Sequence, residues 1–401
     1  MLNFIKEKKN CTGCAACYNI CPIGCISMLE DEEGFLYPSA DERCIHCNKC
    51  ITVCPIFNNK IEKKLEIEQY GVAAISNDNS VWNASSSGGA FSEICNVFGD
   101  NDTVIFGAAF EELKVKHLWV TGVENIDIFR KSKYVQSDLS NNFKQAEDFL
   151  RQGRKVIFSG TPCQIAGLKS YLKQEYDNLL CIDLICHGVG SPKVFKASLS
   201  YMETRYNAKI TKYTFRYKKV KFGNFREYMS QYVFDDYKEF LVDKDVYNQL
   251  FLAQLCLRPS CQSNCYFRTV NRISDITIAD FKNKIKIFPR LNDFRNYSTI
   301  IVNSEKGDAV LKKLYTKMSI LPCRLTDIIA YNPLFCKNTV DNKMRNLFFT
   351  DFIAGLEINF LIKKYLGRVK EDKFVFLKSL IPYRFKFLAL KIISIMHDER
   401  T

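Results

Sequence analysis

The sequence has no uninterrupted apolar run long enough to cross a lipid bilayer, so no transmembrane helix is expected. Its opening stretch, MLNFIKEKKNC, lacks the apolar core of a signal peptide, and we expect a cytoplasmic protein. Low-complexity segments that would indicate disorder are absent, and 47% of the residues are hydrophobic, an ordinary share for a globular protein. The 401 residues therefore predict two or three folded domains.

Common nucleotide-binding and nucleic-acid-binding motifs are also missing. The chain has neither a GxGxxG fingerprint nor a Walker loop, so no Rossmann or P-loop site is predicted. It has no recognition-helix motif and no RNA-binding signature, and its net charge of +13 is spread over the body of the chain. Residues 1–57 are slightly acidic, with five Lys and Arg against seven Asp and Glu. Nucleic acid is therefore not expected as a partner.

Cysteine, by contrast, is abundant, with 18 residues. In a chain without an export signal, so many cysteines indicate metal ligation rather than disulfides. Two runs, CTGCAACYNICP from Cys11 and CIHCNKCITVCP from Cys44, repeat the pattern C-x2-C-x2-C-x3-C-P, which holds two 4Fe-4S clusters. A zinc module needs only two cysteine pairs and has no use for the third cysteine or the Cys-Pro. Residues 1–57 are therefore predicted to form a ferredoxin-type domain of the bacterial two-cluster kind, whose task is electron transfer.

The spacing also predicts the ligands of each cluster. Three closely spaced thiolates bind one cluster, and the fourth cysteine of the run reaches the other cluster. The first cluster is expected to take Cys11, Cys14, Cys17 and Cys54. The second cluster is expected to take Cys44, Cys47, Cys50 and Cys21. Cys25 lies outside the repeat and is expected to be a core thiol, and His46 is expected to be a spacer in a surface loop.

Beyond a charged linker at residues 58–69, strand and helix patterns alternate. Strands are expected at 70–75, 103–110, 116–122, 155–160, 179–186, 274–281 and 297–304. Helices are expected at 85–98, 137–153, 191–206 and 305–315, with a β-hairpin across 209–235. The fold class predicted for the chain is thus α+β and α/β: a ferredoxin-type domain, a mixed α/β domain over residues 70–345, and a helical tail over 346–401.

The predicted tail is basic, because residues 361–396 carry nine Lys and Arg against two Asp and Glu. Two interpretations stay open. A basic amphipathic helix suits peripheral contact with a membrane surface or with a partner. A helix pair packed on the body, with its lysine side chains reaching to solvent, has the same pattern.

Two features of the α/β domain carry chemistry. The segment SSSGGAF, Ser85 to Phe91, offers free N–H groups at a helix start, which suit an anion, although serine caps on helices are common. Five further cysteines, at positions 163, 186, 256, 261 and 265, are consistent with a four-thiolate site or with buried free thiols. Cys163 sits at a strand-to-helix turn, where the helix dipole is expected to lower its pKa. Because its nearest histidine candidate, His187, lies beside Cys186, we favour a ligand over a nucleophile.

From Met1 to about Tyr315, the chain resembles the family of coenzyme F420 hydrogenase/dehydrogenase beta subunits, in its longer form with an N-terminal two-cluster module. The resemblance is carried, in order, by the segments SSSGGAFSEI, KSKYVQSD, SGTPCQIAGLKSYL, CHGVGSPKVF, CLRPSCQSNCYF, SDITIADF and YSTIIVNSEKGDAVL. It implies a non-Rossmann α/β domain that binds FAD beside a third 4Fe-4S cluster. The implied ligands of that cluster are Cys163, Cys186, Cys261 and Cys265, which leaves Cys256 spare. The implied FAD-binding residues are Ser85, Ser86, Ser87, Gly88, Gly89, Lys133, Tyr134, Thr161, Gln164 and Asp280.

The chain departs from the family pattern at two points. Three residues rather than two separate Cys261 from Cys265, and the family's Gly-Asp-Phe-Trp-Gly reads Ala-Asp-Phe-Lys-Asn at positions 279–283. The second departure puts a cation, Lys282, near the expected flavin edge.

The resemblance implies an iron–sulfur flavoprotein oxidoreductase. Electrons would pass from the ferredoxin-type clusters through the third cluster to FAD and to an organic small-molecule substrate, with no catalytic residue assigned. Family members in bacteria that lack coenzyme F420 are associated with cell-surface polysaccharide genes. The alternative is an electron-transfer subunit of a larger redox complex, without substrate chemistry of its own. Either function implies a redox partner, such as a ferredoxin or a partner subunit.

Overall fold

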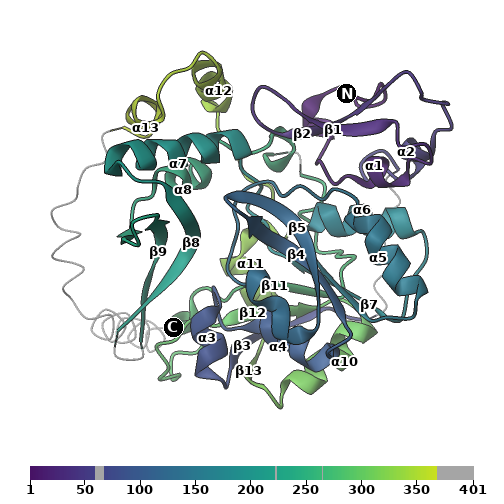
Figure 1. Cartoon of the computed structure of the whole chain (residues 1–401). Coiled ribbons are helices and arrows are strands. Elements are labelled where there is room, and N and C mark those ends of the chain that lie inside the picture. Colours follow the sequence, from purple (N-terminus) through teal and green to yellow (C-terminus); the bar gives the residue numbers. More distant parts are fainter. Residues whose placement is uncertain (59–66, 222–223, 264, 368–401) are drawn as a thin grey trace.

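The computed structural model describes residues 1–58, 67–221, 224–263 and 265–367 (Figure 1). Most of the expected linker, residues 59–66, and the expected tail beyond residue 367 lie outside the described residues. Every helix in the described part is too short or too polar to cross a lipid bilayer.

The N-terminal module is a small unit of two strands and two short helices at one edge of the molecule (Figure 1). Its elements are α1 (Ala16–Ile20), β1 (Ile26–Glu30), β2 (Leu36–Ala40) and α2 (Lys49–Thr52). The two strands pair antiparallel, with Ile26 opposite Ala40. Each helix contains the third cysteine of its run, Cys17 in α1 and Cys50 in α2, and follows a residue in the left-handed conformation, Ala15 or Asn48.

An eight-stranded mixed sheet forms the centre of the body, in the order β13-β3-β12-β11-β7-β6-β4-β5. The strands are β3 (Tyr70–Ser76), β4 (Val104–Glu111), β5 (Lys114–Thr121), β6 (Val156–Ser159), β7 (Leu179–Leu184), β11 (Ile276–Asp280), β12 (Ser298–Val302) and β13 (Met318–Cys323). The middle strands β4, β6, β7 and β11 run parallel, and the flanking pairs are antiparallel. The middle strands are nearly all apolar because both faces of this part of the sheet are covered.

Helices cover both faces of the sheet (Figure 1). They are α3 (Asn79–Ala84), α4 (Ala90–Phe98), α5 (Asn142–Arg151), α6 (Pro162–Leu172), α9 (Lys284–Ile287), α10 (Glu305–Leu314) and α11 (Leu325–Tyr331). Helices α4 and α10 pack on one face, and α5 and α6 on the other. The core under α5 and α6 also contains Cys14, Ala16 and Val53 of the N-terminal module. The module therefore shares a hydrophobic core with the body.

A second, three-stranded sheet stands beside the large one, in the order β10-β9-β8. Its strands are β8 (Ile210–Lys221), β9 (Asn224–Phe234) and β10 (Glu239–Val242). Two helices share a hydrophobic core with it, α7 (Pro192–Tyr206) and α8 (Val246–Leu252). Helix α13 (Ile358–Leu366) packs on α7 and α8, and α12 (Arg345–Ile353) packs on α13. The described part of the predicted tail is thus a helix pair packed on α7 and α8, while residues 368–401, to which the membrane interpretation mainly applies, lie outside the described residues.

The predicted fold class is confirmed: a two-cluster ferredoxin-type module precedes a mixed α/β body, and helices follow at the C-terminal side. The expected strands and helices of the body are all present. Sequence analysis missed the edge strand β13. Pro322 interrupts that pattern, but the lost N–H of a proline is tolerated at the edge of a sheet.

Gly88 provides a test of how tightly β3 and β12 hold the loop between them. A Cβ atom added to Gly88 would lie 2.2 Å from the Ala74 carbonyl oxygen and 2.5 Å from the Ser298 nitrogen, both backbone atoms. We expect Gly88→Ala to lower the free energy of unfolding by about 2 kcal/mol, because overpacking against a rigid backbone forces strands apart. Urea denaturation of Gly88→Ala beside Ser86→Ala, a change on the same loop with no added volume, measures this. Equal midpoints for the two variants would contradict the expectation.

Candidate redox site

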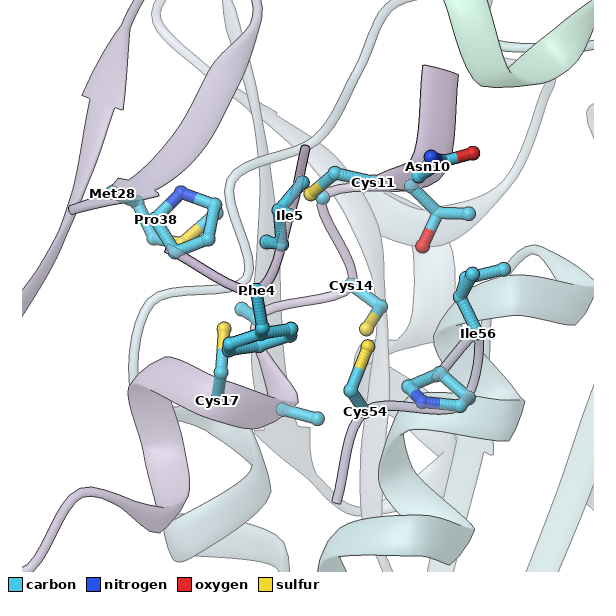
Figure 2. A pocket seen from close by; sticks show the side chains of 15 residues that line it. Phe4, Ile5, Asn10, Cys11, Cys14, Cys17, Met28, Pro38, Cys54 and Ile56 are labelled. Atoms are coloured by element: carbon cyan, nitrogen blue, oxygen red, sulfur yellow. The ribbon is translucent and has the colours of Figure 1, made fainter. Parts of the chain in front are cut away.

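The first cysteine group lies where the N-terminal module meets α6. One cavity is lined by Cys11, Cys14, Cys17 and Cys54 together with apolar side chains of the module. Figure 2 shows Cys14 and Cys54 pointing toward each other, with Cys11 and Cys17 on either side of Phe4 and Ile5. The sequence places Cys54 far from the other three, so the structure brings together the four residues expected for the first cluster.

Burial makes this group unfavourable for free thiolates. Burial, helped by the neighbouring Cys54 and Cys11, raises the pKa of the Cys14 thiol to about 12. The Cys17 pKa is raised well above its ordinary value by burial and then by Cys14. Four buried or half-buried thiols close together carry charge favourably when cations lie among them, and the irons of a 4Fe-4S cluster supply such cations. The donor set therefore fits a cluster.

The two cysteine runs share one backbone conformation despite different residues. Gly13 and His46, at the same place in each run, have φ values of 71° and 53°. Ala15 and Asn48, two residues further, have φ values of 58° and 59°. Alternating left-handed residues turn successive N–H groups to one side, an arrangement found around iron–sulfur sites. His46 thus has a defined task as a spacer, because histidine tolerates the left-handed conformation better than most residues.

The second group contains one thiol more than expected. Burial raises the pKa of Cys50, and the nearby Cys44 and Cys47 add to the rise. The Cys21 sulfur lies 3.4 Å from the Cys25 sulfur. Burial, together with Cys21 and Cys44, raises the pKa of Cys25 to about 12. Cys25 is buried as expected, but it is a neighbour of the second group and not a remote core residue.

The third group gathers at the end of the body nearest the module. Cys163 is the second residue of α6, Cys186 follows β7, and Cys261 ends the 3-10 turn at Pro259–Cys261. Arg268 ties two of these segments together, since its guanidinium donates to the carbonyl oxygens of His187 at 2.8 Å and Cys261 at 2.9 Å. The fourth member, Cys265, is near enough to act on the ionisation of Cys163, Cys186 and Cys261.

The ionisation expected for Cys163 from its helix position is wrong. Burial raises the Cys163 pKa well above its ordinary value, and the thiols of Cys261, Cys186 and Cys265 add to the rise, although Thr161 opposes it from 3.1 Å. The penalty of burial and of like charges exceeds the stabilisation from the helix dipole. A buried thiol with this pKa is a poor nucleophile, whereas a metal ligand is deprotonated by the metal itself.

Two further observations bear on the three groups. Cys256 is fully buried and takes part in none of them; its carbonyl oxygen accepts a hydrogen bond from the Ser191 nitrogen. In the described part of the chain, no three His, Cys, Asp or Glu side chains converge on a point that suits a single metal ion. The four thiolates of a 4Fe-4S cluster bind four different irons, so they need not converge on one point.

A cavity of about 480 Å³ opens beside the third group. Its lining includes Cys186 and His187 and the residues Ser85, Ser86, Ser87, Gly89, Lys133, Tyr134, Thr161, Gln164 and Asp280, which the family resemblance implies for FAD. Gly88 is the exception, since its N–H donates to Ser298 Oγ at 2.9 Å and it packs between β3 and β12. Residues from four separate segments thus meet at one cavity whose volume is in the range of cofactor sites.

Gln164 reaches the cavity from a fixed position. Its side-chain oxygen accepts a hydrogen bond from the Thr161 nitrogen at 2.9 Å, which makes a capping box at the start of α6. Its side-chain nitrogen donates to Ser137 Oγ at 3.0 Å, and that hydroxyl lies 2.8 Å from His117 Nδ1. Burial lowers the His117 pKa to about 4, so this histidine is neutral at physiological pH. His117 lines the cavity, and sequence analysis did not identify it.

Positive charge predominates in the cavity lining. The cations there are Arg130, Lys131, Lys133, Arg216 and Lys282, against the acids Asp183 and Asp280. Both acids are paired, Asp183 with Arg272 at 3.4 Å and Asp280 with Arg216 at 2.8 Å. Burial and, to a lesser extent, the nearby Lys131 together lower the Lys133 pKa to about 7. Such a lining favours an anionic ligand.

The three-stranded sheet covers one side of the cavity, which sequence analysis did not foresee. Arg216 on β8 stacks over the Tyr228 ring of β9 at 3.7 Å, and the Tyr228 hydroxyl donates to the Ser86 carbonyl oxygen at 2.6 Å. Lys218 donates to the Ser87 carbonyl oxygen at 2.9 Å. The signal in the sequence was the alternation TFRYK, which sets Arg216 and Lys218 on one face of a strand.

Comparison with known proteins gives two family matches. Residues 153–324 match the C-terminal part of the beta subunits of coenzyme F420 hydrogenase/dehydrogenase, and residues 10–58 match the 4Fe-4S dicluster domain. One subunit of the F(420)H(2) dehydrogenase of Methanosarcina mazei is 24% identical over 188 residues, which cover 44% of this chain and 53% of that protein. The chain therefore matches about half the length of that relative.

The module has relatives of its own. An uncharacterized ferredoxin of Methanocaldococcus jannaschii is 35% identical over 54 residues, covering 14% of this chain and 70% of the ferredoxin. Among solved structures, a chain from the F420-reducing NiFe hydrogenase complex of Methanosarcina barkeri is 16% identical and covers 67% of this chain and 91% of its own length, with a TM-score of 0.41.

The crossed arrangement of the first group can be tested by combining substitutions. If Cys54 and Cys14 bind the same cluster, Cys54→Ser and Cys14→Ser each remove about four irons per chain, and the double variant removes no more than either alone. Cys54→Ser combined with Cys47→Ser is expected to remove about eight. Iron analysis of anaerobically purified protein measures the losses. Cys256→Ser is the control and keeps all its iron; additive losses for the first pair would contradict the arrangement.

Proposed function

We propose that this chain is an iron–sulfur flavoprotein oxidoreductase, because residues 153–324 match the C-terminal part of coenzyme F420 hydrogenase/dehydrogenase beta subunits and residues 10–58 match the 4Fe-4S dicluster domain. At the coarser level it is an iron–sulfur redox protein that transfers electrons through 4Fe-4S clusters. The finer proposal adds a third cluster, FAD in the 480 Å³ cavity, and an organic substrate reduced or oxidised there.

One contact carries the proposal, that between α6 and the module. Cys163 begins α6, and Gly167 stands four residues further on, about 6 Å along the helix. A Cβ atom added to Gly167 would lie 3.0 Å from the Cys14 sulfur, so the bare helix backbone touches the first cysteine group. The first and third groups are therefore separated by a single turn of one helix. Such proximity supports direct electron transfer between the clusters that they would bind.

The order of the groups then continues to the cavity. Cys186 belongs to the third group and also lines the cavity, and His187 lines it beside Cys186. Single electrons that enter at the module would thus meet the third group before they reach the cavity. A flavin bound in the cavity would supply the means to join one-electron carriers to a two-electron reaction.

The side chains of the cavity would hold and orient that cofactor. The Lys133 ammonium donates to the carbonyl oxygens of Ile128 and Arg130 and is held at the cavity wall. The Arg216–Asp280 ion pair forms another part of the lining. Lys282 is exposed at the rim, where a substrate would enter, and its charge favours an anionic group on that substrate.

A second candidate function is an electron relay for a partner subunit, without substrate chemistry on this chain. The observation that favours it is the exposed second group: Cys47 is exposed, and the adjacent Ile45 is 61% exposed. An apolar side chain beside an accessible cluster suits a docking redox protein. The discriminating measurement is turnover by the isolated chain with a chemical reductant and F420, nicotinamides or sugar nucleotides as acceptors. Activity only after a partner protein is added would favour the relay.

The cofactor content is the first prediction of the proposal. Anaerobically prepared protein is expected to contain about twelve irons and one flavin per chain. Cys163→Ser is expected to keep the flavin and lose about four irons, because it removes one ligand of the third cluster, whereas Cys256→Ser keeps all twelve. Iron and flavin analysis of the three proteins measures this. About eight irons and no flavin in the unsubstituted chain would overturn the proposal.

The second prediction concerns the pH dependence of flavin binding. Lys133 is charged below about pH 7 and neutral above it, so the affinity for an anionic flavin is expected to fall as pH rises from 6 to 8. Lys133→Met is expected to bind about tenfold more weakly at pH 6, about 1.4 kcal/mol, and to lose the pH dependence. Lys133→Arg stays charged and is expected to bind tightly at every pH. Flavin fluorescence titrations measure the dissociation constants.

Lys218 is an alternative source of the pH dependence, and the Lys133→Arg variant distinguishes the two lysines. Burial also lowers the Lys218 pKa to about 7, but Lys218 bonds to the outer side of the serine loop and is not part of the cavity lining. A pH dependence that persists in Lys133→Arg would assign the effect to Lys218 in place of Lys133.

A further inference from the structure

Arg258 is a fully buried cation at the contact between the N-terminal module and the body. Its guanidinium donates to three oxygens: the Cys11 carbonyl at 2.9 Å, the Leu36 carbonyl at 3.1 Å and Gln136 Oε1 at 3.2 Å. All three acceptors are neutral. In the described part of the chain, no carboxylate forms an ion pair with Arg258. This distinguishes it from two other buried arginines, Arg272 and Arg345, which pair with acids.

A cation buried without a negative partner is unfavourable by several kcal/mol. Each nitrogen of the Arg258 guanidinium makes one hydrogen bond, but these bonds do not neutralise its charge. The Tyr37 and Phe35 rings lie 4.0 and 5.5 Å from the guanidinium and provide part of the stabilisation. A negative charge supplied by something bound nearby would account for the rest.

Arg258 touches both the first and the third cysteine groups. A Cβ atom added to Gly13, between Cys11 and Cys14, would lie 3.2 Å from the guanidinium carbon. The main chain of Arg258 contacts the third group: its carbonyl oxygen accepts a hydrogen bond from the Cys261 nitrogen at 2.9 Å. Its own nitrogen donates to the Val189 oxygen, three residues beyond Cys186. The one residue thus spans the interval between the groups.

We propose that Arg258 is a positioning residue that holds a positive charge between the first and third clusters and makes both easier to reduce. This inference rests on the proposed function. In the proposed transfer, one electron would pass from the reduced first cluster to the oxidised third cluster, and Arg258 would be neither oxidised nor reduced and would exchange no proton. Its charge would stabilise the reduced form of either cluster.

Gln136 offers an isosteric way to cancel this charge. Its side-chain oxygen accepts from Arg258 and from the Leu36 nitrogen at 3.0 Å. Its side-chain nitrogen is buried and has no hydrogen-bond partner in the described structure. Gln136→Glu keeps both accepted bonds, loses no donated one, and adds a negative charge beside the guanidinium.

Arg345 is a matched control for the mechanical part of the contact. It is buried, lies over the Phe349 ring at 4.5 Å, and joins the module to the body through Glu33 and the Leu257 carbonyl oxygen. Arg345→Met therefore weakens the same contact without removing a cation from between the two cysteine groups.

The experiment is a potentiometric titration, followed by EPR, of anaerobically prepared Arg258→Met, Arg258→Lys, Gln136→Glu and Arg345→Met. In Arg258→Met and Gln136→Glu, reduction of the first and third clusters is expected to be about tenfold less favourable, a shift of about 59 mV toward lower potential for a one-electron couple. Arg258→Lys is expected to restore most of the shift. The second cluster is the internal reference, because none of its cysteines is a hydrogen-bond partner of Arg258 in the described structure.

The outcomes separate the inference from the function on which it rests. Suppose that the protein contains twelve irons and a flavin, and that the potentials of the first and third clusters in Gln136→Glu and Arg258→Met equal those in Arg345→Met. This result would overturn the role of Arg258 and leave the proposed function standing. Eight irons and no flavin in the unsubstituted chain would overturn the proposed function before any variant is compared. If Arg258→Met fails to fold, Gln136→Glu against the unsubstituted chain decides, since its size and hydrogen bonds are unchanged.

Discussion

Thiols that are buried against one another resist ionisation, and the arrangement of this protein follows from that constraint. Burial raises the pKa of thiols in all three cysteine groups, and neighbouring thiols raise it further. Metal cations in place of the protons would remove most of this repulsion. A 4Fe-4S cluster held by four thiolates keeps a net negative charge, so a buried cation beside it would be favourable. The proposed role of Arg258, which has no acid of its own among the described residues, follows from that charge.

Helix α6 connects the third cysteine group, the cavity and the N-terminal module, because its cap, Cys163 and Gly167 lie within a few residues of one another. Thr161 and Gln164 make the cap, and Pro162 fits the first turn, where its missing N–H has no partner to lose. Cys163 follows at once, so the capped turn holds its thiol in place. Gly167 has no side chain, which lets Cys14 of the module approach the helix. One helix therefore fixes the third group, one wall of the cavity and the position of the module.

Much of this organisation could be predicted from the sequence, because local patterns specify it. The two cysteine runs predict the module, and apolar periodicity predicts the strands and helices of the body. What the sequence does not contain is the distance between segments. Nothing near Arg258 in the sequence indicates that Leu36, Gln136 and Cys11 surround it, since those contacts depend on docking of the module. The three-stranded sheet was expected only as a hairpin, so the cover that Arg216 and Tyr228 provide was missed.

Two of the three departures from the family motif at positions 279–283 replace glycines, and the backbone conformation shows whether glycine is required there. Ala279 lies in β11 opposite Thr299, in an ordinary strand position that does not require glycine. Asn283 stands where the motif has its last glycine and has a φ of 53°, a left-handed value that asparagine adopts more readily than most residues. Both changes therefore preserve the path of the chain.

Lys282 is the change that alters the chemistry. It replaces a large aromatic ring with an exposed cation at the rim of the cavity, on a backbone that the other two changes leave in place. The site next to the expected flavin thereby loses a stacking surface and gains a charge. A planar apolar ligand loses affinity there, and a ligand with a carboxylate or phosphate gains it. We therefore expect the difference between this chain and the family pattern to affect the ligand that would meet the proposed flavin, and not the proposed path of electrons toward it.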